Sequence, residues 1–345
     1  MKKPVLGISI GDPAGIGPEI TFKALDRSDI YEECVPVIYA DTVVLEDTAA
    51  ITGKGFTLRR ITDPKEAAGT RGLIDYIDPG ILKKGDYTYG AVGVKSGEAS
   101  FQYVVAAIKD ALAGSTVGVV TGPINKEAIN LAGHHYAGHT EIFAEYTKTK
   151  NYGMLLSGGG LKVIHVTTHV SMKQACDLMT KEKVLNTIHL ADLALKLMGR
   201  DPRRIGVAGF NPHASENGLF GSEEAAGIIP AIEAAKAEGL DVTGPVPPDT
   251  VFVKAMGDQF DIVVAMYHDQ GHIPLKLCGF RMDPQTGLYS QISGINTTIG
   301  LPIIRTSVDH GTAFGKAGKN RANEESMIDA LKMAITFAKN WKPGT

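Results

Sequence analysis

The stretch Phe260-Asp-Ile-Val-Val-Ala-Met-Tyr-His-Asp269 decides the fold, because a short run of β-branched and apolar residues leads directly into polar side chains. The stretches Lys162-Val-Ile-His-Val-Thr-Thr-His169 and Arg204-Ile-Gly-Val-Ala-Gly-Phe-Asn-Pro-His213 repeat the pattern. We interpret all three as parallel strands, whose carboxyl ends share one edge of an open sheet. His169, His213 and His268 are therefore expected to approach one another. A shared metal ion is one hypothesis, and hydrogen-bonded structural histidines are the other.

Apolar runs and helical patterns alternate along the whole chain. The expected strands are 5–10, 35–39, 117–121, 163–166, 205–208 and 262–266, and the clearest helical patterns are 97–113, 181–198 and 222–238. This βα order predicts an α/β fold with a mainly parallel sheet and helices on both faces.

The length of 345 residues exceeds the usual size of a single hydrophobic core, so we expect two lobes. The first would comprise about 1–130 with 295–345, and the second about 131–294. Segment 277–295 is the least regular part of the chain, with three glycines and a proline, and it is expected to be a loop or hairpin insertion.

The composition excludes several classes of protein. A net charge of −3 and a pI near 6.4 give no basic surface for nucleic acid. No apolar stretch has the length of a membrane span, and no signal-peptide pattern opens the chain, so we expect a cytoplasmic protein. Three cysteines without Cys-x-x-Cys spacing indicate neither a disulfide framework nor a thiolate metal site.

The glycine-rich segment 11–19, Gly-Asp-Pro-Ala-Gly-Ile-Gly-Pro-Glu, follows the first expected strand. Such a turn can present backbone N–H groups to an anion at a helix N-terminus. The segment fits neither the dinucleotide-binding fingerprint nor the P-loop. A tight βα turn, capped by Asp12 or Pro18, is the alternative interpretation.

Further polar clusters follow apolar runs. They are Thr121–Lys126, the histidine-rich segment 134–141, and 306–312 after the apolar run 299–304. Two carboxylates, Asp249 and Asp269, could act as bases or as partners of metal ligands. Each cluster alone is typical of a polar loop or a helix cap, but together they favour a functional site.

Seven of these motifs resemble the 4-hydroxythreonine-4-phosphate dehydrogenase family. They are GDPAGIGPE (11–19), TGPINK (121–126), GHTE (138–141), TTH (167–169), NPH (211–213), YHDQG (267–271) and GLPIIRTSVDHGTAF (300–314). The resemblance spans nearly the whole chain. It implies the two-domain isocitrate/isopropylmalate dehydrogenase-like fold, a homodimer with the active site in the cleft and at the subunit interface, and oxidation of the substrate with NAD or NADP and a divalent metal.

The resemblance also implies roles for individual residues. The metal-binding positions match His169, His213 and His268, and the substrate-binding positions match His139, Thr140, Lys276, Asn296 and Arg305. The stretch 277–295 is longer than in the vitamin B6 enzymes. It is similar to the branch that oxidises 4-phospho-D-threonate or 4-phospho-D-erythronate.

These residue types suit the implied chemistry. A three-histidine site leaves metal positions open for substrate oxygens, with zinc as our first choice and magnesium, manganese or cobalt as alternatives. Asp269, Asp249 and Lys126 are the candidate bases for the hydroxyl proton. Lys276, Arg305 and the turn at His139 and Thr140 could bind the substrate phosphate.

We therefore predict a cytoplasmic, homodimeric, metal- and NAD(P)-dependent dehydrogenase. Its substrate would be a four-carbon 3-hydroxy acid 4-phosphate, which it would oxidise with decarboxylation. The rivals are a dihydrodiol dehydrogenase acting on a non-phosphorylated aromatic diol, a phosphate acyltransferase of the same broad fold, and a catalytically silent binding protein. The choice between NAD and NADP stays open, because no acidic or arginine residue marks a ribose site.

Overall fold

A computed structural model of the protein describes residues 3–282, 284–285, 289–292 and 294–342. The chain divides into two compact units: unit 1 comprises Met1–Lys150 with Leu301–Thr345, and unit 2 comprises Asn151–Gly300. The sequence predicted the same discontinuous order, with boundaries near 130 and 295. The first boundary lies later because α6 (His139–Tyr146) packs on α4 (Val94–Leu112) of unit 1. No change in composition marks that point.

Unit 1 is built on a parallel sheet in the strand order β3-β4-β2-β1-β5-β14. Its strands are β1 (Val5–Ser9), β2 (Val35–Tyr39), β3 (Thr57–Arg60), β4 (Leu73–Ile77), β5 (Gly118–Thr121) and β14 (Ile304–Val308). Its other helices are α1 (Gly17–Ala24), α2 (Ser28–Glu33), α3 (Thr42–Thr52), a 3-10 turn (Pro64–Glu66), α5 (Lys126–Leu131) and α12 (Glu325–Asn340).

Unit 2 has the strand order β13-β6-β7-β10-β8-β9, in which β6 runs antiparallel to both neighbours and the remaining pairs are parallel. The strands are β6 (Gly153–Gly158), β7 (Leu161–His165), β8 (Ile205–Ala208), β9 (Val242–Val246), β10 (Ile262–Ala265) and β13 (Ile295–Ile299). The helices are α7 (Met172–Asp177), α8 (Lys181–Leu197), a 3-10 segment (Pro212–Glu216), a π-helical turn (Glu224–Ile228), α9 (Ile229–Ala237), α10 (Val251–Met256) and α11 (His268–Gly279).

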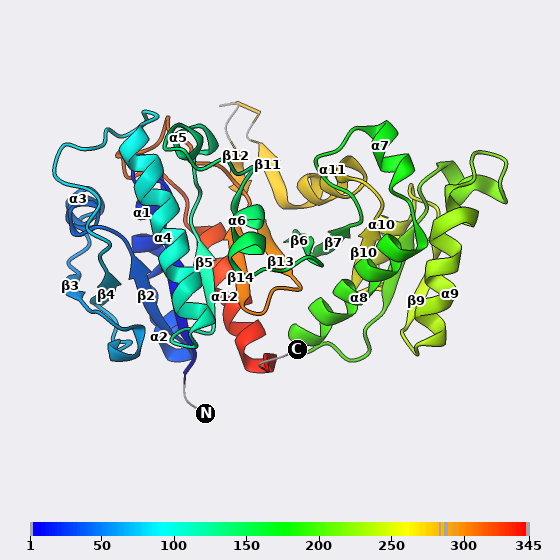
Figure 1. Ribbon diagram of the computed structural model, residues 1–345, viewed down its shortest axis with the longest axis horizontal. Helices are drawn as coiled ribbons and strands as arrows, with labels where there is room; N and C mark the ends of the chain where they lie inside the picture. Colours follow the sequence, from blue (N-terminus) through cyan, green and yellow to red (C-terminus); the bar gives the residue numbers. More distant parts are fainter. Residues whose placement is uncertain (1–2, 283, 286–288, 293, 343–345) are drawn as a thin grey trace. The chain divides into compact units, whose positions relative to one another are not determined.

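Both faces of the central strands are covered. Every residue of β5, β8 and β10 is buried, and consecutive side chains of a strand point to opposite faces. In unit 1, α4 packs along β1, β2 and β5, and in unit 2, α8 packs against β10 (Figure 1). The predicted α/β class, with a mainly parallel sheet between layers of helices, is confirmed. Within the described residues, no helix combines the length and the apolar character needed to cross a bilayer.

The glycine-rich segment after β1 is a buried βα turn. Oδ1 of Asp12 accepts a hydrogen bond from the Ala14 N–H at 2.8 Å and closes the turn. A Cβ atom on Gly17 would lie 1.9 Å from the Ile10 carbonyl oxygen, so only glycine fits there. The alternative interpretation of a tight βα turn closed by Asp12 is thus confirmed, with Pro18 in the first turn of α1 and Ile16 as the helix N-cap. The motif therefore serves the close approach of strand and helix.

Two other local expectations can be compared with the structure. The polar segment 306–312 was expected to follow a strand over 299–304, but β13 ends at Ile299 and β14 extends to Val308. Arg305 and the first residues of the polar segment therefore lie inside β14. In segment 277–295, α11 continues to Gly279 before β11 (Phe280–Met282) pairs antiparallel with β12 (Tyr289–Ile292). The hairpin expected there is thus confirmed in its described part, and positions 283, 286–288 and 293 lie outside the described residues.

Candidate functional site

The three predicted metal-binding histidines follow three adjacent strands. β10 pairs in parallel with β7 on one side and with β8 on the other, so the carboxyl ends of all three strands lie at one edge of the sheet. His169 follows β7, His213 follows β8, and His268 begins α11 directly after β10. The strand-end rule thus places them at one edge, as the sequence predicted.

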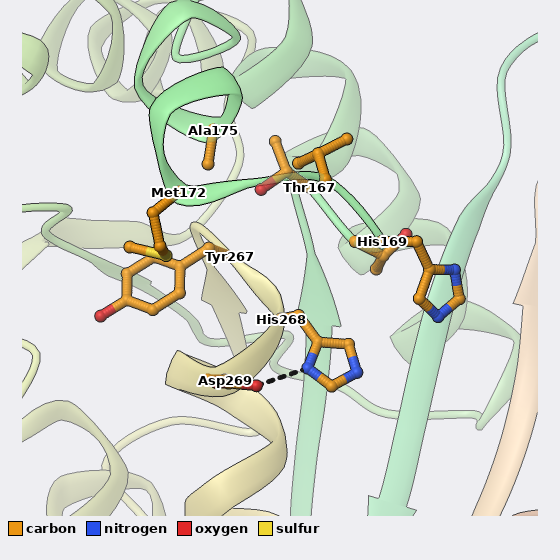
Figure 2. Close-up of a pocket in the computed structure, with 9 residues that line it drawn as sticks. Thr167, His169, Met172, Ala175, Tyr267, His268 and Asp269 are labelled. Carbon is orange, nitrogen blue, oxygen red and sulfur yellow. Dashed lines mark hydrogen bonds and ion pairs between the residues drawn. The ribbon is translucent and has the colours of Figure 1, made fainter.

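Two of these histidines share a pocket. His169 and His268 line a pocket of about 290 Å³, together with residues of α7 and of the strand ends: Thr167, Thr168, Val170, Met172, Ala175, Tyr267 and Asp269. The centroids of the two imidazole rings lie 5.8 Å apart. Figure 2 shows Asp269 directed back at His268.

His268 is held on two sides. Its Nδ1 lies 2.7 Å from Oδ1 of Asp269. An imidazole whose Nδ1 donates to a carboxylate keeps its lone pair on Nε2, the state that binds a cation. The ring of His272 stacks on that of His268 with centroids 3.6 Å apart. Sequence reasoning missed His272, although its spacing of four residues along a helix could have indicated this contact.

Behind this pair lies a further imidazole. His165 is buried, its ring centroid lies 4.7 Å from that of His272, and its Nε2 has no hydrogen-bond partner among the described residues. Burial, followed by the charge of neighbouring histidines, lowers the pKa of His165 to about 3 and that of His272 to about 4. Both rings are therefore neutral near pH 7 and do not repel a cation bound nearby.

The backbone of His213 has a left-handed conformation. It begins a left-handed run in which His213, Ala214 and Ser215 have φ values of 55°, 55° and 66°. It is exposed and does not line the pocket. In the described part of the chain, no group of three or more His, Cys, Asp or Glu side chains is positioned to hold a metal. Imidazole nitrogens are suitable ligands for a divalent cation, and two of the three proposed ligands, His169 and His268, line the same pocket.

Unit 1 carries a buried cation among the predicted substrate residues. Arg305 is 3% exposed within β14, and its Nη2 donates to Oγ1 of Thr121 at 3.2 Å. Its Cζ lies 5.7 Å from the centroid of the Phe143 ring. Burial lowers the pKa of Arg305 to about 10, so the guanidinium remains charged at neutral pH. A buried guanidinium is a strong binding group for phosphate or carboxylate.

His139, the first residue of α6, belongs to the same group. Its Nε2 is buried and has no hydrogen-bond partner within the described residues. Burial, followed by the charges of Arg305 and Lys126, holds the pKa of His139 well below its usual value. Thr140 follows it on α6. Arg305 and Lys126 supply positive charge, and the neutral ring of His139 offers a nitrogen without a hydrogen-bond partner in the described residues. This combination is suited to binding an anion.

The other predicted residues are more exposed. Lys276 on α11 is exposed, and its Nζ lies 5.5 Å from the centroid of the Phe280 ring. Asn296 is half-buried on β13, and Asp249 is exposed in the turn before α10, outside the pocket lining. Lys126 is exposed at the start of α5. The candidate bases are thus not brought together: Asp269 alone lines the pocket.

Comparisons with known proteins agree with this architecture. The family described as "Pyridoxal phosphate biosynthetic protein PdxA" matches residues 32–334. The D-threonate 4-phosphate dehydrogenase of Salmonella typhimurium is 44% identical over 98% of this chain and 100% of its own length. The 4-hydroxythreonine-4-phosphate dehydrogenase of Desulfosudis oleivorans is 44% identical over 97% of this chain and 96% of its own length.

Solved structures extend the similarity. The crystal structure of a 4-hydroxythreonine-4-phosphate dehydrogenase from Burkholderia phymatum matches with a TM-score of 0.83 and 42% identity over 98% of this chain and 99% of that chain. A beta-decarboxylating dehydrogenase from Thermococcus kodakarensis, at a TM-score of 0.50 and 12% identity, shares the fold alone. The fold is thus of the predicted isocitrate/isopropylmalate dehydrogenase type. The chain therefore belongs to the PdxA family, and it is a dehydrogenase.

Proposed function

We propose that this dehydrogenase oxidises a four-carbon 3-hydroxy acid carrying a phosphate on C4, with NAD or NADP as hydride acceptor and with loss of carbon dioxide. The observation that carries the proposal is the buried guanidinium of Arg305 beside the unsatisfied Nε2 of His139. A guanidinium can form paired, charge-assisted hydrogen bonds with a phosphate. The names of the relatives support a phosphorylated four-carbon substrate.

Among such substrates, we favour 4-phospho-D-threonate or 4-phospho-D-erythronate over 4-hydroxythreonine 4-phosphate. The long segment 277–295 joins two proposed substrate ligands, Lys276 and Asn296. A segment anchored at both ends by ligands is suited to recognising the substrate. Sequence identity separates the two branches only slightly, because a relative named as a putative D-threonate 4-phosphate dehydrogenase is 48% identical and one named for 4-hydroxythreonine 4-phosphate is 44% identical.

The phosphate would contact Arg305, Lys276, His139 and Thr140. Arginine and lysine supply charge-assisted hydrogen bonds, and His139 Nε2 gains the partner that it lacks. Asn296 would contact the remainder of the substrate. The proposed working form is a cytoplasmic homodimer, as the family resemblance implies.

A divalent metal is the second part of the proposal, with His169, His213 and His268 as its ligands and zinc as our first choice over magnesium, manganese or cobalt. When bound, such an ion would polarise the hydroxyl that is oxidised. Asp269 already accepts a hydrogen bond from His268, which suits it to orienting that ring. Lys126 or Asp249 would then take the hydroxyl proton, and a nicotinamide cofactor, when bound, would supply the hydride acceptor.

One alternative has a specific observation behind it. A structure named terephthalate 1,2-cis-dihydrodiol dehydrogenase, from Burkholderia xenovorans, matches with a TM-score of 0.70 and 31% identity. The substrate in that name carries no phosphate, so a buried cation for a phosphate would be unnecessary. The likeness to a phosphotransacetylase, at 13% identity, is one of fold alone.

The test is steady-state kinetics with NAD and with NADP on the three 4-phosphorylated substrates. We expect the highest specificity constant for D-threonate or D-erythronate 4-phosphate. A higher value for 4-hydroxythreonine 4-phosphate would overturn the substrate preference while leaving the dehydrogenase intact. Oxidation of an aromatic cis-dihydrodiol, with no reaction on any 4-phosphate, would establish the alternative.

A further inference from the structure

The loop that carries His213 is anchored at one peptide group. The carbonyl oxygen of Gly209 accepts a hydrogen bond from Nε2 of Gln270 at 2.8 Å, and the N–H of Phe210 donates to Oε1 of Glu224 at 2.8 Å. The peptide unit between Gly209 and Phe210 is thus held on both edges by buried side chains. The left-handed run that starts at His213 begins three residues after Phe210. Such a conformation persists only where its surroundings fix it.

Gln270 also binds the element that carries His268. Its Oε1 accepts a hydrogen bond from the N–H of Met266 at 2.7 Å, directly after β10. The carbonyl oxygen of Met266 accepts a hydrogen bond from Oγ1 of Thr167 at 2.8 Å, two residues before His169. The side chain of Gln270, which is 8% exposed, therefore joins the ends of β8 and β10, and Met266 in turn bonds to the end of β7.

We propose that Gln270 is a positioning residue that holds the His213 loop in register with His268 for metal binding. This inference rests on the proposed metal site. A glutamine in the first turn of a helix commonly accepts a bond from the preceding backbone. Here the amide also donates to a separate loop, which a carboxylate cannot do. The proposal therefore depends on the side-chain NH₂ group of Gln270, which donates the hydrogen bond to Gly209.

The test compares Gln270→Glu with Gln270→Met and with a matched control, Gln174→Glu. Gln270→Glu keeps the acceptor for Met266 and loses the donor to Gly209, while Gln270→Met keeps the volume without adding charge. Gln174 holds the equivalent third position of α7, where its Oε1 accepts from the N–H and the hydroxyl of Ser171. The readouts are hydrogen exchange of the metal-free protein and affinity for zinc and cobalt by chelator competition.

We expect both Gln270 variants to exchange faster over 209–217 and to bind metal roughly 10- to 100-fold more weakly, as for residues that orient metal ligands. Gln174→Glu should match the wild type. Unchanged exchange at 209–217 in both variants would overturn the proposal, and so would faster exchange with unchanged metal affinity. If the wild type itself bound neither zinc nor cobalt, the proposed metal site would fall, and the positioning role with it; that failure appears before any variant is compared.

Discussion

The Asp269 carboxylate accepts a hydrogen bond from Nδ1 of His268 at 2.7 Å, although 71% of the Asp269 side chain is exposed. An exposed carboxylate has no need of an internal partner, because water satisfies it. The hydrogen bond therefore matters mainly for His268, because it fixes the tautomer and the orientation of the imidazole ring. This pair supports the proposal that the pocket binds a cation.

The first prediction concerns this pair. Replacing Asp269 with alanine should weaken zinc binding roughly 10- to 100-fold, because His268 loses the partner that sets its tautomer. The fold should persist, since the side chain is largely exposed. Chelator competition measures the effect, with Asp177→Ala, an exposed carboxylate of α7, as control. Wild-type affinity together with a large fall in kcat would instead identify Asp269 as the base.

The second prediction concerns the three ligands. Alanine at His169, His213 or His268 should each remove most of the bound metal and abolish turnover, with an unchanged circular dichroism spectrum, because each residue lies beyond a strand end. His189→Ala is the matched control, since His189 is an exposed histidine of unit 2 that pairs with Glu238. Full metal retention by all three variants, measured by elemental analysis, would refute a shared site.

The third prediction concerns the phosphate. Arg305→Ala or Lys276→Ala should lower kcat/KM for the phosphorylated substrate roughly tenfold to a hundredfold, the value of one charge-assisted hydrogen bond. Arg305→Lys, which keeps a buried charge, separates a loss of recognition from a loss of stability. Arg27→Ala removes an exposed arginine of unit 1 that pairs with Asp29 and should leave the kinetics unchanged. Wild-type kinetics in both alanine variants would rule out these contacts.

The fourth prediction concerns Asp12, whose pKa burial raises to about 6. A folded-state pKa above the unfolded value means that the folded protein binds the proton more tightly. Asp12 therefore costs stability progressively as the pH rises from about 4 to 6, and the full cost persists above 6. Asp12→Asn should abolish this dependence, so its unfolding free energy relative to wild type should rise by roughly 2–3 kcal/mol between pH 4 and 7.

Denaturant titrations from about pH 2 to 7 measure the effect and its control. Asp29→Asn is the control of opposite sign, because the Arg27 guanidinium lowers the pKa of Asp29 to about 2. In that variant, stability relative to wild type should fall slightly as the pH rises through about 2 to 4. A constant difference between Asp12→Asn and wild type from pH 4 to 7 would show that the Asp12 carboxyl ionises normally in the folded protein.

Much of the sheet could be predicted, because buried parallel strands are continuous apolar runs. The expected strands 35–39 and 205–208 match β2 and β8 residue for residue. β3 was missed because it contains Arg59 and Arg60 and lies at the edge of the unit 1 sheet, where side chains are exposed. The position of Arg305 inside β14 was not predicted, because a buried arginine in a central strand is rare.

The site was predictable in part. The strand-end rule brings three histidines to one edge from the sequence alone, but the direction of each ring depends on loop conformation. The left-handed backbone at His213 and the bond from Gln270 to Gly209 involve residues about sixty positions apart, which no local pattern encodes. The roles of His139, Lys276 and Asn296 came from the family resemblance, and their local sequence alone is typical of polar loops.

One measurement tests the central claim most directly: the initial rate of nicotinamide reduction, followed by absorbance, with D-threonate 4-phosphate and with unphosphorylated D-threonate. The account predicts steady formation of reduced NAD or NADP with the phosphorylated acid, and a specificity constant at least tenfold lower without the phosphate. Equal rates on the two acids, or no nicotinamide reduction with any of the three 4-phosphorylated substrates, would contradict it.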